Sequence, residues 1–424
     1  MKVLVVGGGG REHALCWALR PTLSAGDLFC APGNPGTADL ATNLPIGSED
    51  LDRLVGATNT HAIDLTIVGP EAPLAKGLAD RLRAAGRAVF GPSAAAARIE
   101  ASKAFAKEVM AEAGVPTAPS RTFTELGPAL AYVDRHAEPL VVKASGLAAG
   151  KGAFVCAKRD EARRAVTSML RDGIFGEAGK TVIVEDCLHG EELSVLAITN
   201  GRDLTLLPPA QDHKRLGEGD RGPNTGGMGA YSPVSMATPA LLDRVERDVL
   251  RPTLEALARR HTPFAGVLYA GLMVDSAGTP NVIEFNCRLG DPETQAILPR
   301  VTSGLLESFH AAALGEHLPG ITVAEGAAVT TVLAAAGYPE APQRGDPITF
   351  PASLPEGVTV FHAGTQRDEE GVLRTNGGRV LAVTATAPTF AEARAKSSAA
   401  AQAIDFPGKQ FRHDIGWREE ARRR

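Results

Sequence analysis

The stretch KVLVVGGGGREHALCWAL, at positions 2–19, decides the fold of the first part of this chain. Its first five residues, Lys2–Val6, are almost continuously apolar, which is typical of a parallel strand buried on both faces. Four glycines follow, and alanine and leucine then recur at helical spacing from position 14 to position 19. A strand, a glycine turn and a helix in this order predict a βα unit.

The same order recurs along the first hundred residues. Short apolar runs at 27–30, 65–68 and 88–90 each end in a turn rich in glycine and proline, with helical sequence after it. This repetition predicts a doubly wound parallel sheet, and such sheets bind ligands at the carboxyl ends of their strands. The candidate substrate-binding residues at these ends are Gly8, Gly9, Gly10, Arg11, Glu12, Pro32, Gly33, Asn34, Gly69, Pro70 and Glu71.

The glycine run Gly7–Gly10 is suited to bind a phosphate, because backbone N–H groups and a helix N-terminus converge there. A dinucleotide fingerprint requires G-x-G-x-x-G, whereas the third position here is Glu12. The second strand also ends without the acidic residue that holds an NAD ribose. We therefore favour a monophosphate over NAD, and a tight turn without a ligand stays the alternative.

Residues 139–157, PLVVKASGLAAGKGAFVCA, predict two strands joined by a glycine-rich turn. A Walker loop needs four residues between its glycines and a hydroxyl after its lysine, but three residues intervene here and a glycine follows Lys151. A flexible hairpin with one lysine can still close over phosphates and exclude water. Lys143, on the strand before it, adds a fixed cation. Two lysines are often a solvated edge, but these small neighbours favour phosphate binding.

A third motif, Glu284-Phe285-Asn286, ends the strand predicted at 280–285. Residues two apart on a strand point to one face, and a carboxylate and an amide oxygen suit a Mg²⁺ ion that bridges phosphates. Arg288 lies just beyond and is placed to stabilise a transferring phosphoryl group. An isolated E-x-N would more often be a charged turn, but the sequence CRLGDPE at 287–293 favours a site.

The remaining sequence predicts a long polar, glycine-rich loop at 211–233, in which His213 is as readily a structural histidine as a base. Short β-like runs and an alanine-rich helix near 391–404 predict a separate C-terminal domain. We predict an N-terminal α/β domain (1–101), a two-lobed central unit (102–320, with one lobe at about 117–190) and a small α+β domain (321–424).

Composition excludes several classes of protein. The 424 residues are too many for one core, and 44% hydrophobic with 22% charged residues is ordinary for a globular protein. A net charge of −5 provides no basic field for nucleic acid. The five cysteines include no CxxC pair, which favours a reduced cytoplasmic protein over a zinc or disulfide framework. No apolar run reaches about 18 residues, so no membrane span is expected, and the N-terminal apolar run is too short for a signal peptide.

Taken in order, these motifs resemble the bacterial phosphoribosylamine–glycine ligase family, also called glycinamide ribonucleotide synthetases. Each motif alone is weak, but their order and spacing over nearly the whole chain are highly specific. The similar segments are GGREHAL (9–15), APGN (31–34), IVGPEAPL (67–74), SKAF (102–105), GLAAGKG (146–152), QDHKR (211–215), NTGGMGAYSP (224–233), EFNCR (284–288), GDPETQ (290–295), TNGGRV (375–380) and DIGWR (414–418).

This resemblance implies an ATP-grasp fold and an ATP-dependent ligation in purine biosynthesis. The glycine carboxylate would take the γ-phosphoryl group of ATP, and the amine of 5-phosphoribosylamine would attack the resulting acyl phosphate. The products would be glycinamide ribonucleotide, ADP and phosphate. The implied cofactor is Mg²⁺ or Mn²⁺, the implied partners are small molecules rather than nucleic acid or membrane, and the implied assembly is a monomer or weak dimer.

The resemblance also assigns roles to residues. Catalytic roles fall to Arg288, Asp212 and Lys151, and the metal ligands would be Glu284 and Asn286. The ATP-binding set is Lys103, Lys143, Gly150, Lys151, Gly152, Glu185, Asp186, Leu188, Glu192 and Lys214, in which 185–188 meets adenine and Glu192 holds the ribose. The Gly7–Gly10 loop would take the 5-phosphate. Further substrate contacts would come from Asp212, Asn224, Gly226, Arg288 and Glu293.

Two departures from the family pattern stand out. Ser145 occupies a position where the family often has Asp, which affects a local contact of the lid. The strand at 269–274 lacks the acid that many ATP-grasp enzymes use as an extra metal ligand, so the number of metal ions stays open.

Three alternatives remain at this stage. A biotin-carboxylase-like or D-alanine-ligase-like enzyme would keep the lid and the Glu284–Asn286 pair but change the N-terminal turns. An NAD-dependent oxidoreductase would leave the motifs at 143–152 and 284–293 unexplained. A non-catalytic nucleotide-binding regulator would be expected to lose Arg288 or the metal pair, and this chain retains both.

Overall fold

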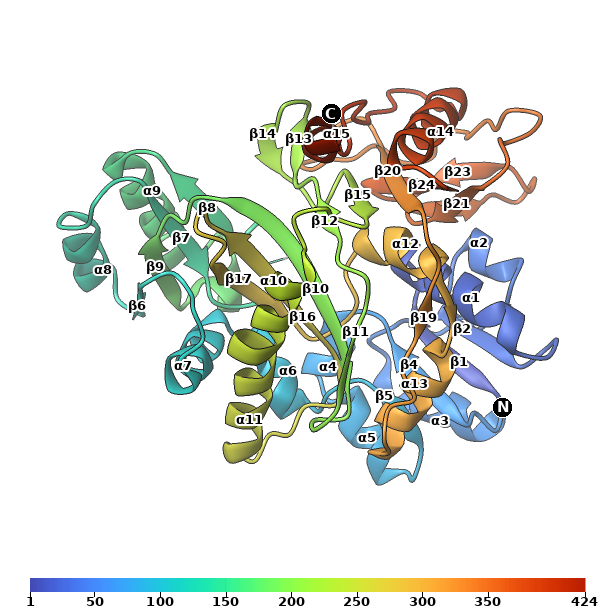
Figure 1. Cartoon of the computed structure of the whole chain (residues 1–424), viewed down its shortest axis with the longest axis horizontal. Coiled ribbons are helices and arrows are strands. Elements are labelled where there is room, and N and C mark those ends of the chain that lie inside the picture. The colour runs from blue at the N-terminus through green and yellow to red at the C-terminus, as the bar shows by residue number, and fades with distance from the viewer. Residues whose placement is uncertain (149, 424) are drawn as a thin grey trace.

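The N-terminal region of the computed structural model, which describes residues 1–148 and 150–423, is a parallel sheet with both faces buried (Figure 1). Its strands are ordered β3-β2-β1-β4-β5. Leu4 and Val6 pack into one core while Val3 and Val5 pack into another, which confirms the doubly wound prediction. The elements are β1 (Val3–Gly7), α1 (Gly10–Leu19), β2 (Leu28–Pro32), α2 (Pro35–Ala38), β3 (Thr42–Asn43), α3 (Leu51–Thr60), β4 (Leu65–Val68), α4 (Glu71–Ala75), α5 (Leu78–Ala84), β5 (Ala88–Phe90) and α6 (Ala94–Ala101).

A separate lobe, drawn in teal at the left of Figure 1, is built on an antiparallel sheet with the order β6-β9-β7-β8. It has a core of its own. The pairing of Lys143 with Ala153 confirms the predicted glycine hairpin, of which Ala149 lies outside the described residues. The elements are β6 (Ser120–Phe123), α8 (Leu126–Val133), β7 (Leu140–Ala144), β8 (Ala153–Cys156), α9 (Arg159–Leu170) and β9 (Val182–Asp186).

The central sheet has the order β11-β10-β16-β17 and lies beside this lobe. The strand predicted at 280–285 is confirmed as β17, which pairs antiparallel with β16 and completes the second lobe of the central unit. Helix α7 begins after Ser102, whose Oγ accepts from the Phe105 N–H at 3.2 Å. The elements are α7 (Lys103–Ala113), β10 (Glu191–Thr199), β11 (Leu204–Leu206), α10 (Pro239–Val245), α11 (Arg251–Arg259), β16 (Gly266–Val274), β17 (Pro280–Asn286), α12 (Glu293–Ile297) and α13 (Leu305–Leu314).

The prediction of a loop at 211–233 is wrong, because part of this segment belongs to the C-terminal sheet. That segment contains four short strands, and two of them, β12 and β15, extend the sheet in the order β12-β15-β20-β24-β21. The polar composition concealed these strands, because β15 pairs with β20, about a hundred residues further on, and β12 pairs with β15. The elements are β12 (Gln211–Asp212), β13 (Arg215–Gly217), β14 (Arg221–Asn224), β15 (Gly229–Ser232), β20 (Ala327–Ala334), β21 (Val358–His362), β24 (Arg379–Ala387) and α14 (Phe390–Ala403), with α15 (Trp417–Arg423) at the end.

Small hairpins complete the fold: β18 (Val301–Ser303) pairs with β19 (Thr322–Val323), and β22 (Thr365–Arg367) pairs with β23 (Leu373–Thr375). Among the described residues, no helix is long and apolar enough to cross a membrane. The exact domain boundaries given above remain a prediction.

A buried arginine ties the β13–β14 hairpin to the C-terminal tail. Arg412, whose side chain is fully buried, donates to Asp220 Oδ1 at 2.8 Å and to Asp414 Oδ1 at 2.7 Å. We expect Arg412→Leu to lower the free energy of unfolding by about 3 kcal/mol, because Asp414 loses its cationic partner and Asp220 keeps only Arg418. Urea unfolding followed by circular dichroism measures this. Arg367→Leu is the control, since that exposed arginine bonds only the Gly371 carbonyl, and equal effects of the two substitutions would contradict the prediction.

Candidate active site

Two lysines from different lobes meet on one carboxylate. Glu185, at the end of β9, forms ion pairs with Lys107 Nζ at 2.7 Å and with Lys143 Nζ. Lys143 also donates to the Ile283 carbonyl of β17 at 3.0 Å. Lys143 therefore lies between the lid lobe and the strand that carries the predicted metal pair. The side chain of Glu185 is occupied with these lysines, so only its backbone is free for the adenine contact that the resemblance implies.

Further positive charge surrounds Glu284 on β17. Burial alone would raise the pKa of Glu284, but Lys214, Lys103 and Lys143 outweigh it and hold that pKa below its ordinary value, so the carboxylate is ionised. Burial would likewise lower the pKa of Lys214, yet Glu192 and Glu284 keep it well above the ordinary value. Lys214 Nζ lies 2.9 Å from Glu192 Oε2. This cluster is suited to receive a polyanion such as the phosphates of a nucleotide.

Arg288 connects the metal-pair strand to the N-terminal domain. Its Nη2 donates to Asn286 Oδ1 at 3.2 Å and to Glu100 Oε1 at 2.8 Å, while its Nε donates to Glu71 Oε2 at 3.3 Å. Burial opposes the charge of Arg288, but Glu100 and Glu71 raise its pKa. Sequence reasoning missed Glu100. The feature of the sequence that could have indicated Glu100 is that it is a carboxylate inside the alanine-rich helix α6.

Glu284 and Asn286 fit a divalent cation. One contributes an ionised carboxylate and the other an amide oxygen, and both are hard oxygen ligands of the kind that Mg²⁺ and Mn²⁺ accept. Two protein ligands leave most of an octahedral shell, of about six positions, to phosphate oxygens and water. The donor set therefore fits a cation that is bound together with a nucleotide.

A pair of acids, Asp212 and Glu293, lies near Lys214. Glu293, the first residue of α12, accepts from Tyr269 Oη at 2.5 Å and from Ser194 Oγ at 3.1 Å. Asp212 Oδ1 is buried and has no hydrogen-bond partner among the described residues. Burial, and then Glu293, raise the pKa of Asp212 well above its ordinary range. An unpartnered carboxylate of high proton affinity is suited to bind an ammonium group or to accept a proton.

His213 has a structural position. Its Nε2 accepts from the Gly416 N–H at 3.0 Å, and burial lowers the pKa of His213 to about 4, so the ring is neutral. The contact ties the segment that carries Asp212 and Lys214 to the C-terminal tail. We assign it no proton transfer.

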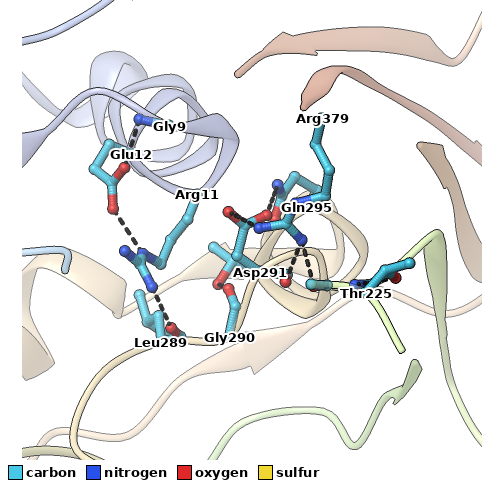
Figure 2. A network of polar contacts seen from close by, with 12 residues as sticks. Gly9, Arg11, Glu12, Thr225, Leu289, Gly290, Asp291, Gln295 and Arg379 are labelled. Carbon is cyan, nitrogen blue, oxygen red and sulfur yellow. Dashed lines mark hydrogen bonds and ion pairs between the residues drawn. The ribbon is translucent and has the colours of Figure 1, made fainter. Parts of the chain in front are cut away.

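The N-terminal glycine turn holds a carboxylate of its own. The Gly9 N–H donates to Glu12 Oε2 at 2.7 Å, and Arg11 Nε donates to Glu12 Oε1 at 2.6 Å (Figure 2). Arg11 Nη1 also donates to the Leu289 carbonyl at 3.1 Å. A Cβ atom at Gly69 would overlap Glu12 Oε1, so a larger residue there would displace the Glu12 side chain. A phosphate at this turn would have to use backbone N–H groups other than that of Gly9.

Asn34 locks the first two turns together. Its Oδ1 caps α2 by accepting from the Gly36 N–H at 2.8 Å, and its Nδ2 donates to the Gly8 carbonyl at 3.0 Å and to the His362 carbonyl at 2.8 Å. Asn34 is thus a scaffold residue of the site. The remaining turn residues at the ends of β1, β2 and β4 are Gly8, Gly10, Pro32, Gly33, Gly69 and Pro70.

Lys151 contacts the C-terminal domain. Its Nζ donates to the Pro339 carbonyl at 3.0 Å, so the structure does not bring it to the lysine cluster. Gly150 and Gly152 flank it in the hairpin.

At the hinge where adenine is expected, the Asp186 N–H donates to the Pro119 carbonyl at 3.1 Å, and Leu188 lies just after β9.

The turn after β14 joins three parts of the chain. Asn224 ends β14 and Gly226 lies in the turn that follows, where Arg379 and Tyr338 of the C-terminal domain both contact it. Figure 2 shows Arg379 and Gln295 pointing toward Asp291. The segments 290–295 and 375–380 resemble the family in sequence, but sequence reasoning gave Asp291, Gln295 and Arg379 no role.

Comparison with known families agrees with this arrangement along the whole chain. Models of phosphoribosylglycinamide synthetase match residues 1–100 (N domain), 101–294 (ATP-grasp domain) and 328–418 (C domain). The chain belongs to this family. The matches cover the ATP-grasp region as well as the first hundred residues, so the oxidoreductase alternative is set aside.

Individual relatives of this family member cover its full length. The phosphoribosylamine–glycine ligase of a Nostoc species is 48% identical over 99% of this chain and 99% of its own. That of Vibrio parahaemolyticus is 46% identical over 100% of this chain and 99% of its own. The crystal structure of the Thermotoga maritima ligase is 36% identical with a TM-score of 0.85, covering 98% of this chain and 100% of its own.

A more distant structure shares the fold alone. The biotin carboxylase domain of the Hydrogenobacter thermophilus 2-oxoglutarate carboxylase is 18% identical, with a TM-score of 0.73 over 97% of this chain and 91% of its own. That structure contains adenosine diphosphate and magnesium.

We expect Asn286→Ala to lower kcat by about a hundredfold or more, because misplacement of a charge-neutralising group by about 1 Å already costs on this order. Asn281→Ala is the matched control, since Asn281 lies on the same strand and donates only to the Thr279 carbonyl. ADP release at saturating ATP, with circular dichroism to check folding, measures both variants. Near-normal turnover of Asn286→Ala would contradict the metal assignment.

The low pKa of His213 predicts a loss of stability in acid. The folded pKa of about 4 lies below the ordinary 6.5, so its contribution to stability is complete above pH 6.5 and is lost as the pH falls toward 4. At pH 5 it costs about 2 kcal/mol. His213→Gln keeps an acceptor for the Gly416 N–H and does not titrate. Urea unfolding at pH 7 and pH 5 should show a smaller pH difference for this variant, whereas the control His189→Gln, at an exposed histidine, should resemble the wild type.

Proposed function

We propose that this chain joins glycine to 5-phosphoribosylamine with cleavage of ATP, where the N-terminal turns, strand β17 and the β12–β15 segment meet. The observation that carries the proposal is Arg288, which donates at once to Glu71 of the N-terminal domain and to Asn286 of the metal pair. This arginine links the expected phosphoribosylamine side to the expected ATP side. The products are glycinamide ribonucleotide, ADP and phosphate.

The nucleotide binds at the lysine cluster. Lys103, Lys143 and Lys214 lie along its phosphates, since these residues already surround the anionic Glu284. A cation held by Glu284 and Asn286, Mg²⁺ or Mn²⁺, neutralises phosphate charge when bound.

Adenine is held at the lobe hinge. The Asp186 N–H is used by Pro119, so adenine meets the backbone further on, at Leu188, and Glu192 holds the ribose. The hairpin at 150–152 covers the phosphates and excludes water.

The ligation proceeds in two displacements. A carboxylate oxygen of glycine attacks the γ-phosphorus, the bond to the bridging oxygen breaks, and ADP leaves. The amine of phosphoribosylamine then attacks the acyl carbon, a C–N bond forms, and phosphate leaves as the C–O bond breaks. Arg288 stabilises the charge on the transferring phosphoryl group.

Asp212 and Glu293 bind the ammonium group of glycine. That positive charge favours the ionised form of Asp212, which then accepts the proton lost by the attacking amine. The unpartnered Asp212 Oδ1 and its proximity to Glu293 support these roles.

Phosphoribosylamine lies against the N-terminal turns. Gly8 and Gly10 flank the Gly9 N–H that Glu12 occupies, and the remaining backbone N–H groups at the start of α1 receive the 5-phosphate. Arg11, with Glu12 and Glu71, borders the ribose.

The partners are small molecules, and the chain acts as a monomer or weak dimer. All five cysteines are free thiols, which supports a cytoplasmic setting.

The test of this function is the dependence of ADP release on each component. With ATP, Mg²⁺, glycine and phosphoribosylamine generated in situ, we expect ADP and glycinamide ribonucleotide in equal amounts, and loss of the product when any one component is omitted. ADP release that is indifferent to glycine would overturn the proposal.

Gly9→Val should raise the KM for phosphoribosylamine by about tenfold or more, because the side chain intrudes on the turn, and should leave the KM for ATP almost unchanged. An equal rise in both would contradict the placement of phosphoribosylamine.

A further inference from the structure

A single side chain of the C-terminal domain connects two turns of the site. Arg379, the first residue of β24, donates from Nη1 to the Asp291 carbonyl at 2.7 Å and pairs through Nη2 with Asp291 Oδ2 at 3.0 Å. Its Nη1 also donates to the Gly226 carbonyl. Figure 2 shows this guanidinium between the turn that contains Thr225 and the turn at Gly290–Asp291. Both turns come from the central part of the chain, so Arg379 reaches them from another domain.

The neighbouring residues of the C-terminal domain hold the same turn. Tyr338 Oη accepts from the Gly226 N–H at 2.9 Å, so Gly226 is held through its N–H and its carbonyl. A Cβ atom at Gly378 would overlap the Tyr338 ring. The glycine before Arg379 therefore allows Tyr338 and Arg379 to reach the turn together.

One turn contains Glu293, and the other packs against Asp212. Gly227 packs so closely that a Cβ atom there would lie 2.7 Å from Asp212 Oδ1 and would overlap Pro292 Cδ. Pro292 directly precedes Glu293. The position of each acid relative to the other thus depends on how these two turns are held, and Arg379 bonds both of them.

Asp291 also faces the N-terminal domain. Its Oδ2 lies 3.9 Å from the position a Cβ atom would take on Gly9, and its Oδ1 accepts from Gln295 Nε2 at 2.7 Å. Without Arg379, an ionised carboxylate would face the expected phosphoribosylamine turn with its main cationic partner removed. Repulsion between that carboxylate and a phosphorylated substrate follows from Coulomb's law.

We propose that Arg379 is a positioning residue for the ligation step: it fixes the 225–227 and 290–293 turns so that the amine of phosphoribosylamine reaches the acyl phosphate. This role rests on the function proposed above. Arg379 belongs to the second displacement rather than to ATP binding, because it bonds Gly226 and Asp291, next to the acid pair and to the expected phosphoribosylamine turn, and not the lysine cluster. If no aligned amine attacks the acyl phosphate, water hydrolyses it.

The test compares Arg379→Gln and Arg379→Lys with the wild type. For Arg379→Gln we expect kcat/KM for phosphoribosylamine to fall by about 10- to 100-fold, as for a misplaced reactant, with a KM for ATP within about twofold of the wild type. The ratio of ADP released to glycinamide ribonucleotide formed should rise above one. Arg379→Lys should recover part of the loss, since it retains the charge but not the fork of donors.

Two further variants keep the test independent of folding. Tyr338→Phe removes only the acceptor for the Gly226 N–H and should raise the same ratio by a smaller amount. Arg374→Gln is the control, since Arg374 pairs with Asp368 in the same domain and its bonds do not include the two turns. Thermal unfolding by circular dichroism confirms that each variant is folded.

The outcomes separate the two proposals. If the wild type shows glycine-dependent ADP release and both Arg379→Gln and Tyr338→Phe keep a ratio of one with normal kinetics, the positioning role is wrong. An equal rise in the KM for ATP and for phosphoribosylamine also overturns it, because that result indicates general disruption. If the wild type itself releases ADP without need for glycine, the proposed function fails.

Discussion

The structure depends on the mutual neutralisation of buried lysines and glutamates where its lobes meet. A buried lysine or glutamate without an opposite charge is costly, and losing one partner of a buried pair leaves that cost uncompensated. Lys103 and Lys107 come from α7, Lys143 from β7 and Lys214 from the segment after β12, and the carboxylates that neutralise them come from β9, β10 and β17. The charges that hold these elements together are also those that a polyphosphate would contact.

Arg288 extends the same principle to the N-terminal domain. It pairs with Glu71 and Glu100, and it contacts the amide of Asn286. Expected substrate sites from two domains therefore share one guanidinium. A movement of either domain changes the contacts of Arg288 with the other domain. Arg379 occupies a comparable position toward the C-terminal domain.

Local signals made much of this architecture predictable. The parallel sheet follows from apolar runs that end at glycine, and the β7–β8 and β16–β17 hairpins follow from turn residues between neighbouring strands. Strands β12 and β15 escaped prediction, because β15 is stabilised by pairing with residues 328–331 and β12 pairs only with β15. Glu100 and Arg379 were missed for the same reason, because no local pattern records such contacts. Glu100 pairs with Arg288, 188 residues away, and Arg379 bonds the Gly226 carbonyl, 153 residues away.

The pairing of β15 with β20 also bears on how the chain is made and how it evolves. A ribosome releases residues 229–232 long before residues 328–331 exist, so this edge of β15 waits unpaired during synthesis. Unpaired edges of this kind favour association between chains. The same interlacing means that the C-terminal sheet cannot be excised or exchanged as a block by recombination, because two of its strands are encoded within the central part of the gene.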